Sequence, residues 1–206
     1  MDSRDIALQS VTPTVMVPRY GDFEPLGSSG HRFLAAADGL WLEARRPWCY
    51  LRRPLAQQCA VAMPYGRVEV VFESISIPFD LVRGFIAAAR KRLPNEAAAW
   101  IVWQQDTGQF SLRLLPEIEA GPGSIRFHRP VLVRGEHVVV DIHSHGTLPA
   151  FFSATDDRDD KGEVKFSCVV GNIDADEPSL CVRLCAIGYF EPIAFPAERL
   201  ACSGGA

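Results

Sequence analysis

The stretch DIHSHGTLPAFFSATDD, residues 141–157, decides how the rest of the chain is interpreted. His143 and His145 end an apolar run, and alternate residues of an extended strand point to the same face. Asp156 follows a short distance after the second histidine. Two imidazoles and one carboxylate are the protein ligands of a catalytic zinc site that keeps its fourth position open. The stretch therefore predicts a zinc centre whose ligands are His143, His145 and Asp156.

The same residues also have ordinary explanations. A pair of histidines is common by chance, although burying two imidazoles without partners at the end of the strand VVVDI would be costly. Ser153 fits the N-cap of a short helix, with Asp156 at the N3 position of a capping box. Both interpretations can hold together, because such a helix would fix Asp156 at its first turn and aim it at the histidines. The nearby acids Asp157, Asp159 and Asp160 are expected to be solvated.

Composition excludes several classes of protein. The chain has 206 residues, of which 48% are hydrophobic and 22% charged, as in an ordinary globular protein. A net charge of -4 argues against a nucleic-acid-binding protein, which usually carries a basic excess. The sequence has neither a membrane-spanning apolar run nor an N-terminal signal segment, and its six cysteines lack zinc-ribbon spacing and are expected to be reduced core residues. We therefore expect a cytoplasmic protein without nucleic-acid or membrane partners.

The first part of the chain predicts a β-rich extension over residues 1–67. Residues 1–30 are rich in proline, glycine and serine, and we expect them to form an extended lead-in. Turns at Asp38-Gly39 and Arg46-Pro47 then separate apolar runs, which indicates a small β meander.

Residues 68–206 predict the main domain. An apolar stripe with helical spacing over residues 78–93 predicts a long helix, and a short helix is expected over 153–161, next to the histidines. Apolar and alternating runs between and after them predict strands. The predicted fold class is α/β, with a mixed, curved β-sheet flanked by helices and the β-rich extension beside it.

The metal-ligand pattern resembles a known family. His143, Ser144 and His145, followed by Ser153 and Asp156, resemble the signature of the JAMM metalloproteases, the catalytic branch of the JAB/MPN domain family. The resemblance covers about residues 70–192, from the strand before the long helix to the last strands. It implies a zinc peptidase with the JAB/MPN fold, which is similar in architecture to that of the zinc deaminases.

The family also needs a glutamate at the start of the strand that follows the first long helix. Glu96 stands at that place, and the resemblance implies that it moves the proton of the attacking water. Glu73 is the competitor, although it lies in an alternating strand before the helix. Ser153 is implied to donate a hydrogen bond to the developing oxyanion. The family often has proline after the second histidine, and we expect Gly146 at this place to loosen the loop without removing a ligand.

A closer similarity is to the protein A family of bacterial PRTRC systems. It is carried by RFLAAADGLWLEARRPW, VAMPYG, PNEAAAWIVW and the histidine stretch. This resemblance implies a deubiquitinase-like substrate, either a peptide or the C-terminus of a ubiquitin-like protein, and a partner related to ubiquitin-activating enzymes. Release of a sulfur-carrier-type protein or of cysteine from an adduct is an alternative within the same chemistry.

Three other classes of protein share part of this pattern or of the fold that it implies. The fragment Asp141 to His145 matches the D-x-H-x-H start of metal phosphoesterases, but no histidine follows His145 to complete such a site. The H-x-E and P-C-x-x-C motifs of zinc deaminases are absent. A non-catalytic JAB/MPN scaffold that binds partners is the alternative from another class, although such domains typically lack the metal ligands that this chain carries.

Overall fold

A computed structural model describes residues 1–57, 63–121 and 124–194 of the chain. The chain divides into two units, Met1–Ser76 and Ile77–Ala206. In the described ranges no helix is long and apolar enough to cross a membrane.

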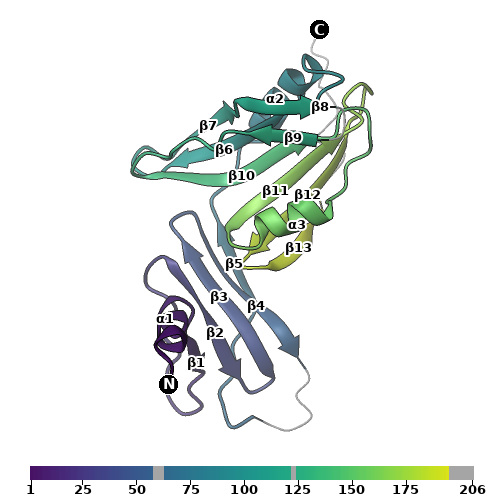
Figure 1. Cartoon of the computed structure of the whole chain (residues 1–206). Coiled ribbons are helices and arrows are strands. Elements are labelled where there is room, and N and C mark those ends of the chain that lie inside the picture. The colour runs from purple at the N-terminus through teal and green to yellow at the C-terminus, as the bar shows by residue number, and fades with distance from the viewer. Residues whose placement is uncertain (58–62, 122–123, 195–206) are drawn as a thin grey trace. The chain divides into compact units, whose positions relative to one another are not determined.

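The N-terminal unit is a five-stranded sheet in the order β1-β2-β3-β4-β5 (Figure 1). β1 runs parallel to β2, and every other neighbouring pair is antiparallel. Turns join β2 to β3 and β3 to β4 where they were expected, and Gly39 at the first of them has a φ of 140°. The strands are β1 (Thr14–Met16), β2 (Gly30–Ala36), β3 (Gly39–Arg46), β4 (Cys49–Gln57) and β5 (Val71–Ser74).

The start of the chain differs from the expected extended lead-in, and that prediction was wrong. Residues Ser3–Val11 form helix α1, and β1 follows it. Asp2 caps the helix by accepting a hydrogen bond from the Arg4 backbone at 2.8 Å. No residue of α1 is buried, so its sequence carries no apolar periodicity by which a helix is recognised.

The C-terminal unit is built on a six-stranded mixed sheet in the order β13-β12-β11-β10-β6-β7 (Figure 1). β10 and β11 are parallel, and the other neighbours are antiparallel. The predicted α/β class is therefore confirmed. The strands of this sheet are β6 (Ala98–Gln104), β7 (Gln109–Leu114), β10 (Glu136–Ser144), β11 (Val164–Gly171), β12 (Ser179–Ala186) and β13 (Tyr189–Ile193). A small separate hairpin pairs β8 (Glu117–Gly121) with β9 (Ser124–Phe127).

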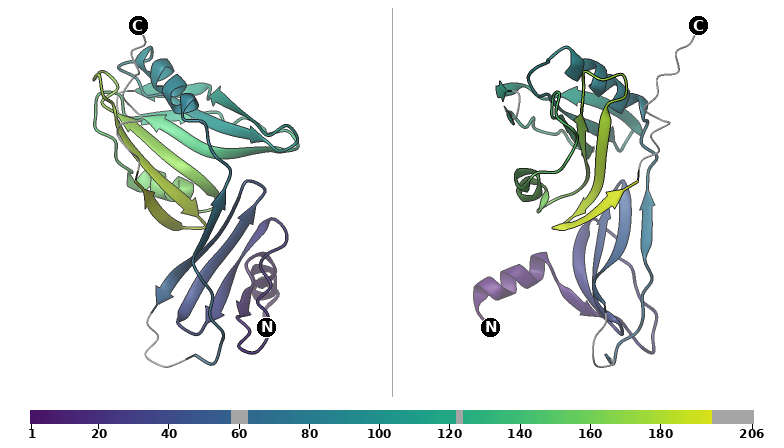
Figure 2. Two further views of the ribbon diagram at one scale, coloured as in Figure 1. Left: turned by 180° about the vertical axis from the view of Figure 1, so that it is seen from behind. Right: turned by 90° about the vertical axis from the view of Figure 1, so that its right-hand side faces the viewer.

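Two helices lie on opposite faces of this sheet. Helix α2 (Asp80–Arg90) buries Val82, Phe85, Ile86 and Ala89, which confirms the predicted apolar stripe, and it packs on β6 and β7. Helix α3 (Ala154–Asp160) lies in front of the sheet in Figure 1, and the reverse view in Figure 2 has α2 in front.

The division between the units falls after Ser76, whereas the sequence placed it after Arg67. The reason is β5, which pairs with β4 in the first sheet. An apolar run that precedes a helix looks the same whichever sheet it joins, because its periodicity does not record its partner.

The cysteines behave as expected where the structure describes them. Four lie in the described ranges, all as free thiols, three of them buried and one half-buried. Cys59 and Cys202 lie outside the described residues.

The connection from β10 to β11 determines where the histidines meet the helix. Parallel neighbours cannot be joined by a tight hairpin, so the chain must cross over the sheet between them. Residues 145–163 make this crossover and contain α3. The crossover brings α3 back over the face of β10 that carries His143.

The loop that follows His145 is held at several points. Gly146 has a φ of 56°, which a proline fixed near −65° cannot adopt. The expected loosening of this loop is not what the structure shows, since its backbone is hydrogen-bonded to the turn after β11 and to β12. The bonds are Ile173 N to Gly146 O (2.9 Å), Asn172 N to Leu148 O (2.7 Å) and Ala150 N to Ser179 Oγ (2.9 Å).

Gly171 allows this loop to cross β11 closely. A Cβ atom there would lie 2.2 Å from Ala150 N and 2.4 Å from Leu148 O. These are backbone atoms, which cannot avoid the clash by changing rotamer as a side chain can. We expect Gly171→Ala to lower the free energy of unfolding by about 1–3 kcal/mol, measured by urea denaturation. Gly162→Ala is the control, because nothing lies within 4 Å of its added Cβ. Equal urea midpoints for the two variants would contradict the close crossing.

Candidate metal centre

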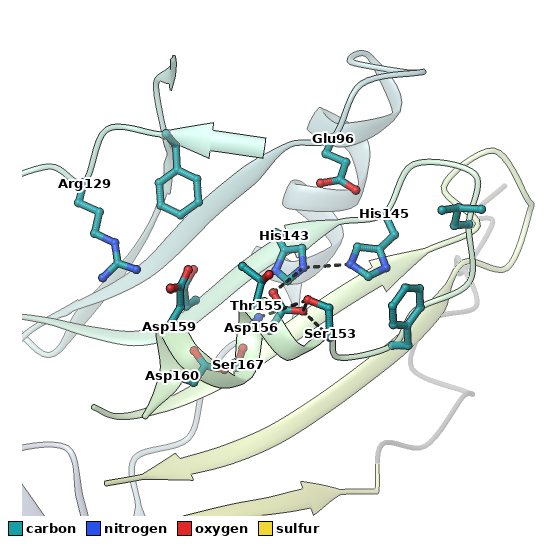
Figure 3. Close-up of a pocket in the computed structure, with 14 residues that line it drawn as sticks. Glu96, Arg129, His143, His145, Ser153, Thr155, Asp156, Asp159, Asp160 and Ser167 are labelled. Carbon is teal, nitrogen blue, oxygen red and sulfur yellow. Dashed lines mark hydrogen bonds and ion pairs between the residues drawn. The ribbon is translucent and has the colours of Figure 1, made fainter. Parts of the chain in front are cut away.

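His143 and His145 converge at the end of β10. His143 lies between Ala98 of β6 and Val169 of β11, and the His145 N–H donates to Val170 O at 2.9 Å. The two Nε2 atoms are 3.2 Å apart (Figure 3). Burial lowers the pKa of His143, so its ring is neutral near pH 7, which is the form that binds metals.

Asp156 uses its two carboxylate oxygens differently. Oδ2 accepts hydrogen bonds from the backbone N–H of Ser153 at 2.6 Å and from its hydroxyl at 2.7 Å. Oδ1 lies 3.5 Å from His143 Nε2. The predicted capping box is confirmed, and it aims Asp156 at the histidines as expected.

The three side chains fit a zinc ion. Their ligand atoms all lie within 4.8 Å of one another. Ligand atoms bonded at about 2.0–2.1 Å to a tetrahedral ion are roughly 3.3 Å apart, close to the two distances above. His145 Nδ1 is buried and has no hydrogen-bond partner among the described residues. A proton on that nitrogen leaves the Nε2 lone pair free for a metal, and a metal bond would offset the unsatisfied donor.

Glu96 completes the site from the other side. It lies two residues before β6, is 5% exposed, and donates its N–H to Gly121 O at 3.1 Å. Its carboxylate points towards the histidines in Figure 3. Burial, and then the charge of Asp156, raise the pKa of Glu96 to about 7. A carboxyl with this pKa can take up and release a proton near neutral pH.

Ser144 fixes Glu96 relative to the histidines. Its side chain is buried and points away from the ligand atoms, as expected for the residue between two inward-facing neighbours. The Ala97 N–H donates to Ser144 Oγ, and the Ser144 N–H donates to Ala97 O, both at 2.9 Å. This reciprocal pair ties the residue between the histidines to the residue after Glu96.

Ser153 is committed to the helix cap. Its hydroxyl has one proton, and that proton is donated to Asp156 Oδ2. Donation to a substrate oxyanion would require this bond to be released, so the oxyanion role stays a prediction. Glu73, the competitor of Glu96, is an exposed residue of β5 in the sheet of the N-terminal unit.

A pocket of about 240 Å³ surrounds these residues (Figure 3). Leu148 and Phe151 form an apolar wall beside His145, whose ring lies 4.5 Å from that of Phe151. Phe127 and six polar residues complete the lining. The polar residues are Arg129, Asp141, Thr155, Asp159, Asp160 and Ser167.

The acids after Asp156 are not all solvated, and that prediction was wrong for Asp160. Asp160 is 3% exposed and Asp157 is half-buried, and each pairs with Arg183, at 2.7 Å and 2.5 Å. Asp159 is exposed as expected. The sequence signal for a partner of Asp160 is Lys165, a charged residue within the mostly apolar run VKFSCVV.

Comparisons with known proteins match both units. Residues 2–74 match a domain of unknown function, DUF2016, and residues 78–184 match a family described as prokaryotic homologs of the JAB domain. No curated protein matches. The solution structure of protein DSY2949 from Desulfitobacterium hafniense is similar at 17% identity with a TM-score of 0.43. It aligns over 55% of this chain and 86% of that one.

The raised pKa of Glu96 predicts how the stability of the metal-free protein depends on pH. As the pH rises, Glu96 loses its proton near pH 4.5 in the unfolded state but keeps it up to about pH 7 in the folded state. The resulting stabilisation is complete below 4.5 and is lost as the pH rises through about 7. Glu96→Gln is neutral throughout, so we expect it to raise the melting temperature relative to wild type at about pH 8 but much less at about pH 5. Glu73→Gln changes an exposed carboxyl and is the control; a Glu96→Gln effect independent of pH would contradict the shift.

Proposed function

The chain belongs to the prokaryotic JAB family, and from that premise we propose that it is a zinc-dependent hydrolase of peptide or isopeptide bonds. The observation that carries the proposal is the convergence of His143, His145 and Asp156 beside the buried carboxyl of Glu96. A scaffold has no need of a buried carboxyl with a pKa near 7 next to two histidines and an aspartate that could hold a metal ion.

His143, His145 and Asp156 would hold the ion and leave one coordination position open. When bound, zinc lowers the pKa of a water molecule and polarises the carbonyl to be cleaved. Two neutral imidazoles and one carboxylate leave the ion with net positive charge, which suits this chemistry.

Glu96 moves the proton. Its carboxylate takes a proton from the attacking water and then gives it to the departing amine. Its pKa of about 7 suits both steps, because neither the charged nor the neutral form is strongly disfavoured. The reciprocal hydrogen bonds between Ser144 and Ala97 keep this carboxylate at its position while the proton moves.

Ser153 stabilises the charge that develops on the carbonyl oxygen. Its hydroxyl rotates from Asp156 Oδ2 to that oxygen, while the Ser153 N–H continues to hold Asp156 at 2.6 Å. The carboxylate thus keeps a donor during the reaction.

The substrate we propose is the extended C-terminal tail of a ubiquitin-like protein, in a bacterial system of the PRTRC type. A pocket of about 240 Å³ admits a few side chains and leaves a folded domain outside. The described residues between Glu96 and His143 form two short hairpins and a loop, without a large insertion that would recognise a folded chain linkage. A ubiquitin-activating-enzyme-like protein is a proposed partner, supported by the sequence resemblance alone.

Glu96→Gln tests the catalytic role. We expect this variant to keep its zinc but to lose about 10²–10⁴-fold in hydrolysis, because proton transfer is removed and the ligands are not. The substrate is a ubiquitin-like protein extended at its C-terminus by a reporter peptide, followed by mass spectrometry. Asp156→Ala is the companion variant and should lower zinc stoichiometry. Wild-type cleavage by Glu96→Gln would refute the base assignment, and a wild-type protein that binds no zinc would favour the scaffold.

Ser153→Ala separates the oxyanion role from the cap. Loss of the cap costs about 0.5–2 kcal/mol of stability, whereas loss of an oxyanion donor costs about 10²–10³ in kcat. We expect both losses, with KM little changed. Ser153→Thr retains the hydroxyl and should restore kcat. If Ser153→Ala is less stable but turns over normally, the hydroxyl serves the cap alone.

A further inference from the structure

Lys165 lies under the metal centre with its charge almost fully enclosed. Its side chain is 2% exposed and its ammonium contacts three carboxylates: Asp141 at 2.8 Å, Asp160 at 3.0 Å and Glu163 at 2.9 Å. An ammonium has three N–H donors, so each can be matched by one carboxylate.

The partners of Lys165 belong to the two elements that supply the metal ligands. Asp141 lies on β10 two residues before His143, and alternate residues of a strand share a face. Asp160 ends helix α3, whose first turn contains Asp156. One ammonium therefore joins the strand of His143 to the helix of Asp156.

Arg183 strengthens the attachment of the helix. Its guanidinium binds Asp157 at 2.5 Å and Asp160 at 2.7 Å. The group lies 3.9 Å from the ring centre of Phe152 and 4.2 Å from that of Phe190. Arg183 is on β12, however, and its ion pairs among the described residues go to α3 and not to the strand that carries His143.

Helix α3 needs such an attachment. It has seven residues, and a helix this short is not stable by its own backbone hydrogen bonds. The capping box fixes the rotation of Asp156 at one end, and the buried ion pairs fix the other end to the sheet. The 3.5 Å between Asp156 Oδ1 and His143 Nε2 is therefore set by contacts beyond the ligands themselves.

We propose that Lys165 is a positioning residue of the metal centre, which sets the separation of Asp156 from His143 by binding Asp160 and Asp141 together. This inference rests on the proposed function. Without the ammonium, Asp141 and Asp160 would repel each other across the floor of the pocket, and the helix would move away from β10. The ligand atoms would then lie too far apart for one ion.

The experiment is zinc affinity of the metal-free full-length protein, measured by competition with a chelator. Lys165→Met keeps most of the side-chain volume and removes the charge, and we expect it to weaken zinc binding about 10–100-fold. Asp141→Ala cuts only the link to β10, leaves the pair between Lys165 and Asp160, and should weaken binding in the same direction.

Arg113→Met is the matched control. It removes an ion pair to Glu136, at 2.7 Å, on the opposite end of the same strand β10. We expect it to lower stability while zinc affinity stays within about twofold of wild type. A purely structural role for Lys165 would give the same pattern as this control.

The outcomes separate the two proposals. If wild type binds zinc and both Lys165→Met and Asp141→Ala bind it equally well, the positioning role is overturned and the proposed function stands. If Lys165→Met does not fold, unchanged zinc affinity in Asp141→Ala overturns the role alone. If wild type binds no zinc, both proposals fail together.

Discussion

The carboxylate of Asp156 joins helix α3 to the histidines, and the site depends on this one group. Oδ2 closes the capping box with Ser153, and Oδ1 faces His143. One carboxylate can both cap the helix and face His143 only if the helix begins directly above the end of β10. The parallel pairing of β10 and β11 provides that position, because the crossover between parallel strands must return over the sheet. Sheet topology and helix capping thus together bring the three candidate ligands into one group.

Charge explains why the site favours a cation. Glu96, Asp141, Asp156 and Asp160 all line one pocket, and carboxylates this close repel one another unless cations lie between them. Lys165 neutralises the floor of the pocket, where Asp141 and Asp160 lie. Within the described residues Glu96 forms no ion pair, and burial, followed by the charge of Asp156, raises its pKa. A bound divalent ion would reduce the repulsion between Glu96 and Asp156, as Lys165 reduces the repulsion between Asp141 and Asp160.

The grouping of His143, His145 and Asp156 was predictable from sequence because their spacing follows local rules. Alternation in a strand places His143 and His145 together, and a capping box aims Asp156. Glu96 was predicted from the family resemblance, which implies a glutamate at the start of the strand after the first long helix. The remaining features depend on contacts between distant segments: the partner of β5, the backbone φ at Gly146, and the burial of Asp160 by Lys165 and Arg183. Helix α1 was missed for the opposite reason, since it buries nothing and leaves no apolar pattern.

The central claim is that three side chains of this chain share one zinc ion. Anomalous X-ray diffraction from zinc-soaked crystals, recorded on both sides of the zinc absorption edge, tests it most directly. The expected result is a single peak about 2.0–2.2 Å from His143 Nε2, His145 Nε2 and Asp156 Oδ1. A crystal with no peak there, or with zinc held only by other residues, would contradict it.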